Sequence, residues 1–475
     1  WLESRIDEIL DGSGIPGAAV TIVNGDERTI TVRGVCREGG GQMITPNTAF
    51  DLGSCSKSFV ATAITLLADQ GKLELDDPVR RYLPEFHLDK AWMDDEVTIR
   101  DLLCNRIGLR RQIPVESFAN PDIDALDIIK RISKLDRLHP FREGYVYFNP
   151  GFMAARLIVE RVSGQSYGEF LNSALFAPLG MRNSASGESL VSQLPEQAVG
   201  HVVRNRQAIP LETDAFDNWQ GAAGVWSSAH NMSRWLGFQL EGGKHEGGEL
   251  LNRDLLVETH LPHTDIPANE CKLIHQPEDG ARTSYCLGWW TGSFLGRRLV
   301  QHAGEMIGWR AQVSLLPEEK VGVAVMLSAS VSLHAVIAYT VLETLLEGKS
   351  RDWQEVAQAR ELQQAEDMDL AMKNAFPISD APGLQLEAYA GRYSHPALGT
   401  LHIAMDDDRL VAKFEDGRIW TTVLEHLGSH VFSMRFLDIS VTDYMPAPLR
   451  ARFDVENGHV ISLTDANASY RREGG

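Results

Sequence analysis

Residues 51–71 read DLGSCSKSFVATAITLLADQG, and they place a Ser-x-x-Lys pair at the start of an apolar pattern. Apolar residues recur at helical spacing between Val60 and Leu67, and the stretch closes on a glycine, as helices often do. Ser54 should therefore lie at the mouth of a helix, with Lys57 about one turn further along the same face. This spacing brings an amine within reach of a hydroxyl, as in an activated serine nucleophile.

A lone Ser-x-x-Lys pair is weak evidence, because serine is a common helix cap and lysine a common surface residue of helices. A competing motif is Gly164-Gln-Ser166-Tyr-Gly168, which matches the nucleophile elbow of the α/β-hydrolases. That elbow needs a strand before its serine, whereas residues 153–162 have helical periodicity. We therefore reject Ser166 as the nucleophile.

Two later segments carry polar side chains that could meet the Ser-x-x-Lys pair. Tyr147 and Asn149 precede Pro150, which biases them toward a loop just ahead of a helix at 151–162. His302-Ala-Gly304 follows a predicted strand, and its glycine would let a backbone approach a ligand closely. Taken singly, these residues are better explained as a half-buried tyrosine, a turn asparagine and a hydrogen-bonded histidine.

Composition narrows the range of partners. Lys and Arg total 45 against 65 Asp and Glu, and the net charge of −20 repels nucleic acid and anionic membranes. A small-molecule or peptide substrate is the better expectation. The 43% hydrophobic content is that of a globular protein, and the absence of a run of eighteen apolar residues predicts no membrane span.

The cysteines and histidines do not predict a metal site. Five scattered cysteines form no Cys-x-x-Cys pair, which argues against a disulfide scaffold and favours a reducing compartment. We expect a cytoplasmic location, the alternative being a leader removed ahead of Trp1. His260-x-x-His263 lacks further ligands, so we expect solvent-facing histidines. Gly348-Lys-Ser lacks the earlier glycine of a phosphate loop, and we expect no cofactor and no metal.

The first 347 residues predict one α/β domain. An N-terminal helix and a hairpin at 18–33 precede the Ser54 helix, and strands near 299–302, 311–316 and 321–327 precede a helix at 333–346. This order indicates an antiparallel sheet flanked by helices. The polar, proline-containing residues 262–283 are a candidate loop or lid.

The remainder of the chain predicts a linker and a smaller domain. Residues 348–383 are charged, helical and then proline-containing, as a linker would be. Short alternating strands follow, with turns such as Asn457-Gly458, over residues 384–475. They indicate a small C-terminal antiparallel β-barrel or sandwich.

Three motifs in this order and at these distances resemble the class C β-lactamase-like and penicillin-binding-protein-type serine hydrolases. They are Ser54-Cys-Ser-Lys57, Tyr147-Phe-Asn149 and His302-Ala-Gly304, and the resemblance covers about residues 1–346. The C-terminal segment more loosely resembles the lipocalin-like barrel appended to many of these proteins.

The resemblance implies a β-lactamase/transpeptidase-like α/β/α sandwich with an inserted helical domain and the site between them. Ser54 would be acylated, while Lys57 and Tyr147 would share the proton transfers and Asn149 would orient substrate or Lys57. The N–H groups of Ser54 and Glu305 would form the oxyanion hole. The implied site therefore comprises the catalytic Ser54, Lys57, Tyr147 and His302, with Asn149, Gly304 and Glu305 for binding.

One departure from the family pattern bears on the substrate. Its lactamases and carboxypeptidases usually carry Lys-Thr-Gly where this chain has His302-Ala-Gly304, and imidazole is a weaker anion anchor that titrates near neutrality. The variant resembles esterases and D-amino-acid-type amidases or peptidases, so we expect a serine hydrolase of esters, amides or peptides. An acyltransferase or peptide cyclase, a β-lactamase and a catalytically idle binding protein are the alternatives. Oligomeric state stays open.

Overall fold

The computed structural model describes residues 2–110, 123–211, 217–275, 277–278, 282–379, 383–415, 421–437, 449–466 and 468–474. Its largest sheet is antiparallel, with the order β10-β11-β12-β13-β14-β15-β1-β2. These strands are Thr264–Ile266, Thr283–Tyr285, Trp290–Phe294, Arg297–Met306, Trp309–Leu316, Val321–Leu327, Gly17–Asn24 and Glu27–Gly34. The predicted N-terminal hairpin is therefore confirmed, and it joins the sheet beside the last strand of the domain, with Val20 opposite Val325.

The sheet is buried on both faces because alternate residues of its central strands enter different cores. In β15, Val323 and Val325 belong to one apolar cluster, while Ala324 and Met326 belong to the other. Side chains alternate across a strand, so a continuous apolar run such as VGVAVML fits a strand covered on both sides.

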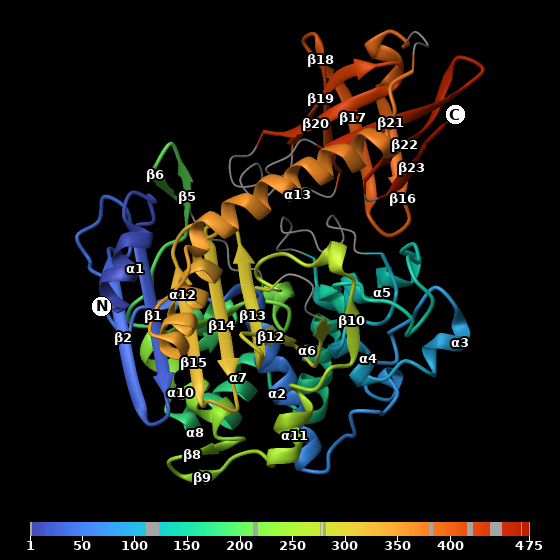
Figure 1. Cartoon of the computed structure of the whole chain (residues 1–475). Helices are drawn as coiled ribbons and strands as arrows, with labels where there is room; N and C mark the ends of the chain where they lie inside the picture. The colour runs from blue at the N-terminus through green and yellow to red at the C-terminus, as the bar shows by residue number, and fades with distance from the viewer. Residues whose placement is uncertain are drawn as a thin grey trace.

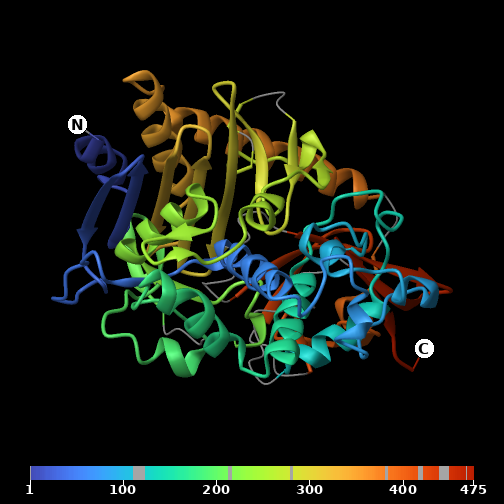
Figure 2. The same cartoon turned by 90° about the horizontal axis from the view of Figure 1, so that it is seen from below.

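Helices cover the two faces as the predicted α/β/α sandwich requires (Figures 1 and 2). Helices α1 (Leu2–Leu10) and α12 (His334–Glu347) pack together on one face, and α12 contacts β14 and β15. On the other face α10 (Ala229–Leu240) contacts β1 and β15, and α2 (Ser56–Asp69) carries the proposed nucleophile motif. None of the helices in the described ranges is long and apolar enough to cross a membrane.

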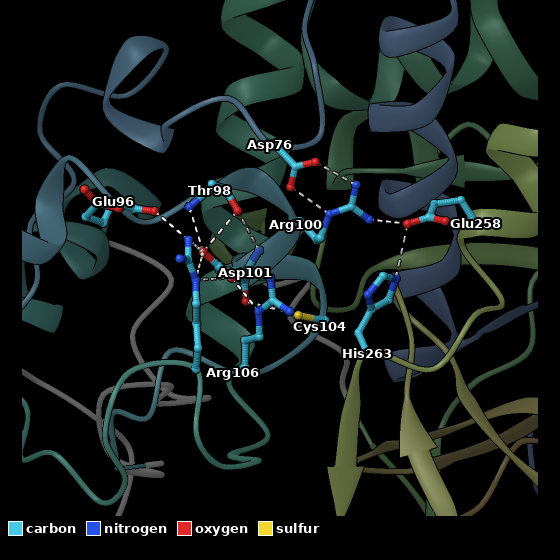
Figure 3. A network of polar contacts seen from close by, with 10 residues as sticks. Asp76, Glu96, Thr98, Arg100, Asp101, Cys104, Arg106, Glu258 and His263 are labelled. Atoms are coloured by element: carbon cyan, nitrogen blue, oxygen red, sulfur yellow. Dashed lines mark hydrogen bonds and ion pairs between the residues drawn. The ribbon is translucent and has the colours of Figure 1, made fainter.

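A helical region stands beside the sheet and contains α3 (Ala91–Asp94), α4 (Ile99–Leu103), α5 (Ala125–Arg131), α6 (Asn149–Ser163) and α7 (Tyr167–Leu171). An ionic network centred on the buried Asp101 lies in and beside it (Figure 3). Asp101 is fully buried and accepts from Arg106 and Arg142, and Arg100 joins Asp76 to Glu258. The buried carboxylate is tolerated because two guanidinium groups neutralise it.

Two expectations for this part of the chain can be checked. Ser166 caps α7 and follows the helix α6, so the predicted helix before it is confirmed and the elbow geometry is lacking. The candidate lid at 262–283 was only partly right. Within it β10 pairs with β11 at the edge of the sheet, while residues 276 and 279–281 lie outside the described residues.

The linker region contains a long helix, α13 (Trp353–Ala375), that leads to a closed antiparallel barrel of eight strands (Figure 1). Trp353 anchors the start of α13 and is 1% exposed. The barrel strands β16 to β23 are Gly391–His395, Gly399–Asp406, Arg409–Phe414, Thr421–Gly428, Val431–Phe436, Leu449–Glu456, His459–Asp465 and Ser469–Arg472. Tyr393, Phe432 and Phe453 are fully buried in this barrel.

Candidate active site

The turn that presents Ser54 is fastened to a small second sheet. Strand β3 (Ala49–Asp51) pairs with β7 (Val225–Ser228), and the turn Gly53–Cys55 follows β3 directly. Val225 holds both sides of this turn, since its carbonyl accepts from the N–H of Leu52 and its N–H donates to Ser56 Oγ. Helix α2 then begins at Ser56, as the apolar spacing predicted.

Lys57 lies buried beside the hydroxyl of Ser54. Its Nζ is 3.0 Å from Ser54 Oγ and donates to the carbonyl of Ala222 at 2.7 Å. The side chain is 0% exposed, and its Nζ lies 4.8 Å from the ring centre of Tyr147 and 5.3 Å from that of Phe152. The structure therefore brings the Ser-x-x-Lys pair and the predicted tyrosine together.

The Tyr147–Asn149 segment enters the site at the start of α6. Phe148 occupies the cap position, Asn149 is the first helical residue and Pro150 follows it, a place where proline costs no hydrogen bond. Tyr147 is half-buried, whereas Asn149 is 3% exposed. The role of Asn149 in orienting substrate or Lys57 stays a prediction.

His302 is fully buried, and its ring is fixed on every side. Nδ1 lies 2.7 Å from the carbonyl of Ala303, so this nitrogen carries the proton, and Nε2 accepts from the Tyr285 hydroxyl at 3.1 Å. The ring stacks on Trp290 with centroids 4.0 Å apart. Burial, together with the charge of Lys57, lowers the pKa of His302 well below its usual value. The expectation that this imidazole titrates near neutrality is wrong, because desolvation favours the neutral form.

The predicted oxyanion strand touches the turn before the nucleophile. A Cβ at Gly304 would lie 1.9 Å from the carbonyl oxygen of Leu52, so only glycine fits there. Gly53 has φ +51°, and a Cβ on it would lie 3.1 Å from the nitrogen of Glu305. The close approach expected at Gly304 is thus made by the protein's own backbone, and it sets the N–H of Glu305 near Ser54.

The paired histidines do not form a metal site in the described part of the chain. His260 is 3% exposed, its Nε2 contacts Gln239 Oε1 at 2.9 Å, and burial lowers its pKa to about 3. His263 lies 3.5 Å from Glu258 (Figure 3). Solvent-facing histidines were therefore the wrong expectation, because His260 packs edge-on against Trp289 and the side chain of His263, near helix α11 (Arg253–Glu258), is only 13% exposed. No group of three or more candidate ligands occurs among the described residues.

Comparison with known sequences agrees with this geometry. The Beta-lactamase family matches residues 2–346, which is most of the chain, and a domain of unknown function, DUF3471, matches residues 378–473. The chain belongs to the beta-lactamase family. The fold and the resemblance drawn from the three motifs are thereby confirmed, and the family consists generally of serine hydrolases.

Curated members of the beta-lactamase family are distant from this chain. Unguisins hydrolase ungD' of Aspergillus campestris is 26% identical over 432 residues, which are 85% of this chain and 77% of that protein. Protein flp of Staphylococcus aureus is 24% identical over 68% of this chain and 62% of its own length. The chain thus spans less than two thirds of protein flp.

Solved structures share the beta-lactamase fold. An octameric penicillin-binding protein homologue from Pyrococcus abyssi superposes with a TM-score of 0.65 and 22% identity, covering 99% of this chain and 98% of that one. A class C beta-lactamase superposes with a TM-score of 0.59 and 19% identity, covering 72% of this chain and 95% of its own. These likenesses support the architecture alone.

Several residues at the site were missed by reasoning from the sequence. Ala222 supplies a carbonyl to Lys57, Phe152 a ring face, and Tyr285 and Trp290 enclose His302. The run SYCLGWW at 284–290 reads as an aromatic hairpin, and the structure pairs Tyr285 with Trp290 across it. The pattern could have revealed the hairpin, but its contact with His302 depends on the sheet order.

Gly304→Ala tests the contact between the oxyanion strand and the nucleophile turn. The added methyl would meet the Leu52 carbonyl. Overpacked sites typically cost about 1 to 3 kcal/mol, and we expect the free energy of unfolding to fall by at least the upper end of that range. Gly292→Ala in β12 is the matched control, since its nearest atoms would be at 3.5 Å. Equal urea midpoints for both variants would contradict this contact.

The buried carboxyl of Asp51 should make the stability of the protein depend on pH. Burial raises its pKa to about 6, although the N–H of Gly53 donates to it at 2.7 Å. Between about pH 4 and 6 the folded protein therefore binds a proton that the unfolded chain has lost, and this stabilisation disappears as pH rises. Asp51→Asn keeps an oxygen acceptor and cannot ionise. As pH rises across this window, the unfolding free energy of the variant should increase relative to that of the wild type by on the order of 2 kcal/mol.

Asp76→Asn is the control for that measurement. The hydrogen bonds from Arg100 lower the pKa of Asp76, so its carboxylate stabilises the folded state above the unfolded pKa and loses this effect as pH falls. The Asp76→Asn variant should therefore lose stability relative to the wild type as pH rises. Urea unfolding in steps from pH 3 to pH 7 covers both windows, because the pKa of Asp76 in the folded state lies below its ordinary value, and a shared sign would refute the assignment for Asp51.

Proposed function

We propose that this protein is a serine hydrolase that forms an acyl-enzyme at Ser54 and acts on esters, amides or peptides. The observation that carries the proposal is the fully buried Lys57, with Nζ 3.0 Å from Ser54 Oγ and beside the ring of Tyr147. A buried amine held against one hydroxyl serves proton transfer better than it serves stability, because burying a charged group is costly.

In the proposed reaction, neutral Lys57 takes the proton of the Ser54 hydroxyl as Oγ forms a bond to the substrate carbonyl carbon. The N–H groups of Ser54 and Glu305 donate to the developing oxyanion. The intermediate collapses with transfer of a proton through Lys57 and Tyr147 to the leaving alcohol or amine. A water molecule then attacks the acyl-enzyme, and the acid leaves while Ser54 regains its proton.

We further propose that the substrate is uncharged where family members with Lys-Thr-Gly hold a carboxylate. His302 stands at the lysine position, is neutral, and has both ring nitrogens engaged by Tyr285 and Ala303. The likeness to an unguisins hydrolase supports a peptide among the candidate substrates. Acyl transfer or cyclisation would use the same residues with another acceptor.

Intact mass after brief incubation with a p-nitrophenyl ester, a D-amino-acid amide and a penicillin tests the nucleophile. We expect an acyl adduct on the wild type and none on Ser54→Ala, because the variant lacks the attacking oxygen. Ser166→Ala is the matched control, which should keep the adduct and lose only about 1 kcal/mol of stability as a helix cap. An adduct on Ser54→Ala, or its loss in Ser166→Ala, would contradict the assignment. Acid or a new amide among the products separates hydrolysis from transfer.

A matched pair of peptides tests the charge preference. An N-acyl D-Ala-D-Ala peptide with a C-terminal methyl ester should give, for initial-rate cleavage of its D-Ala-D-Ala peptide bond, a kcat/KM at least about tenfold above that of the free acid, or about 1.4 kcal/mol. The free carboxylate would lose hydration beside a neutral imidazole that offers no ionic partner. Equal or faster turnover of the free acid would exclude this preference.

A further inference from the structure

The tip of the β13–β14 hairpin lies against the strand that leads to Ser54. Met306 pairs with Trp309 across a two-residue turn, and Glu305 pairs with Arg310. The ring of Trp309 packs edge-on against Phe50 of β3, with centroids 6.1 Å apart, and against Trp226 of β7 at 5.0 Å. The position of this tip therefore sets the position of the Glu305 peptide relative to Ser54.

Arg310 fastens the tip from inside the protein. Its Nη1 donates to the carbonyls of Met306 at 2.9 Å and Trp309 at 2.8 Å, and its Nε lies 4.0 Å from Glu305 Oε1. The residue is 6% exposed, and its buried Nε makes no hydrogen bond to the described residues. The Arg310 guanidinium thus contacts Glu305, whose N–H is a proposed oxyanion donor, and Met306 and Trp309, which flank the hairpin turn.

The groups around Glu305 favour its ionised form, which pairs with the Arg310 guanidinium. Burial raises the pKa of Glu305, but Arg310, with smaller effects of Lys272, His334 and His275, lowers it to about 2. His334 at the start of α12 is fully buried, its pKa is lowered by burial to about 4, and neither ring nitrogen has a hydrogen-bond partner among the described residues. His334 is therefore neutral at neutral pH, and Arg310 is the cation closest to the carboxylate.

Helix α13 contributes a second carboxylate to this cluster. Burial and then the neighbouring Glu305 raise the pKa of Glu361, and Arg310 opposes that rise. Arg310 is therefore near two carboxylates, that of Glu305 at 4.0 Å and that of Glu361 from α13. Its two hydrogen bonds to backbone carbonyls fix its Nη1 at the tip of the hairpin.

We propose that Arg310 is a positioning residue for the oxyanion hole. It holds the backbone N–H of the Glu305 peptide in place through its contact with the Glu305 carboxylate and its hydrogen bond to the Met306 carbonyl. On one side of that peptide, Gly304 packs on the Leu52 carbonyl, and on the other side Arg310 binds the Met306 carbonyl. Displacement of an oxyanion donor by about 1 Å can cost on the order of a hundredfold in rate. The inference rests on the proposed function, since it assigns the support of the same site.

Arg310→Met removes the guanidinium and keeps an unbranched apolar side chain. With a p-nitrophenyl ester we expect kcat to fall about 10- to 100-fold while KM changes less than about twofold, because the donor acts mainly in the transition state. Arg298→Met is the matched control, for it removes an exposed arginine paired with Glu318 at the opposite end of the same hairpin. That variant should retain the wild-type kcat.

Affinity for phenylboronic acid separates positioning from general damage to the fold. Its adduct with Ser54 places an oxygen in the oxyanion hole, so the inhibition constant of Arg310→Met should rise by about the same factor as kcat/KM falls. An unchanged inhibition constant, an unchanged kcat, or an equal loss in Arg298→Met would each overturn the proposal.

Glu305→Gln keeps the peptide N–H and removes the ion pair, so it tests the same idea if Arg310→Met fails to fold. We expect a smaller loss of kcat, and the double variant should be no slower than Arg310→Met, because both changes release the same peptide. The proposal that Arg310 acts through Glu305 would be refuted if Glu305→Gln kept the wild-type kcat and the double variant showed the sum of the two single losses. Ester turnover by the wild type and by Ser54→Ala separates the two proposals: equal turnover in the two proteins means that both fail, and Ser54-dependent turnover leaves only the support in question.

Discussion

The site depends on keeping one amine out of water and against one hydroxyl. Lys57 has no exposed surface, and the groups around its Nζ include the Ser54 hydroxyl, the Ala222 carbonyl and the faces of Tyr147 and Phe152. These groups come from the turn Gly53–Cys55, from the turn before β7 and from the segments on either side of the start of α6. An isolated Ser-x-x-Lys helix could not supply them, because a solvated lysine keeps its proton and its freedom to move.

The same constraint explains why position 302 tolerates a histidine. A cation at position 302 would repel Lys57 whenever that amine carries a proton, whereas a neutral imidazole adds no repulsion. The protein fixes that neutral form by giving Nδ1 a carbonyl acceptor and Nε2 a hydroxyl donor, and Trp290 removes the space in which the ring could turn. The site is therefore built around a single buried amine, with a neutral imidazole and its aromatic neighbours beside it.

Local sequence rules predicted the parts of the fold that depend on nearest neighbours. The helix from Ser56, the hairpin at residues 17–34 and the all-apolar strand β15 follow from periodicity and turn residues. Burial of His260 and the enclosure of His302 by Tyr285 depend on which strands lie side by side, and no local pattern carries that information. Gly304 is an example of what local sequence cannot give. The glycine indicates that another group approaches its backbone closely, but the sequence does not identify that group as the Leu52 carbonyl.

The C-terminal barrel is attached to the sheet face opposite the nucleophile, and that attachment reaches the site. Trp353 is packed against Tyr339 and Phe294, which fixes the first turn of α13, and two turns later Arg360 donates to the carbonyl of Pro277. Glu361 follows, close enough to Glu305 for the two carboxylates to repel each other. Because buried apolar residues of the barrel and of the catalytic region form one continuous cluster, the helix is held at both ends. Helix α13, which leads to the barrel, thus brings a carboxylate near the hairpin that carries Glu305.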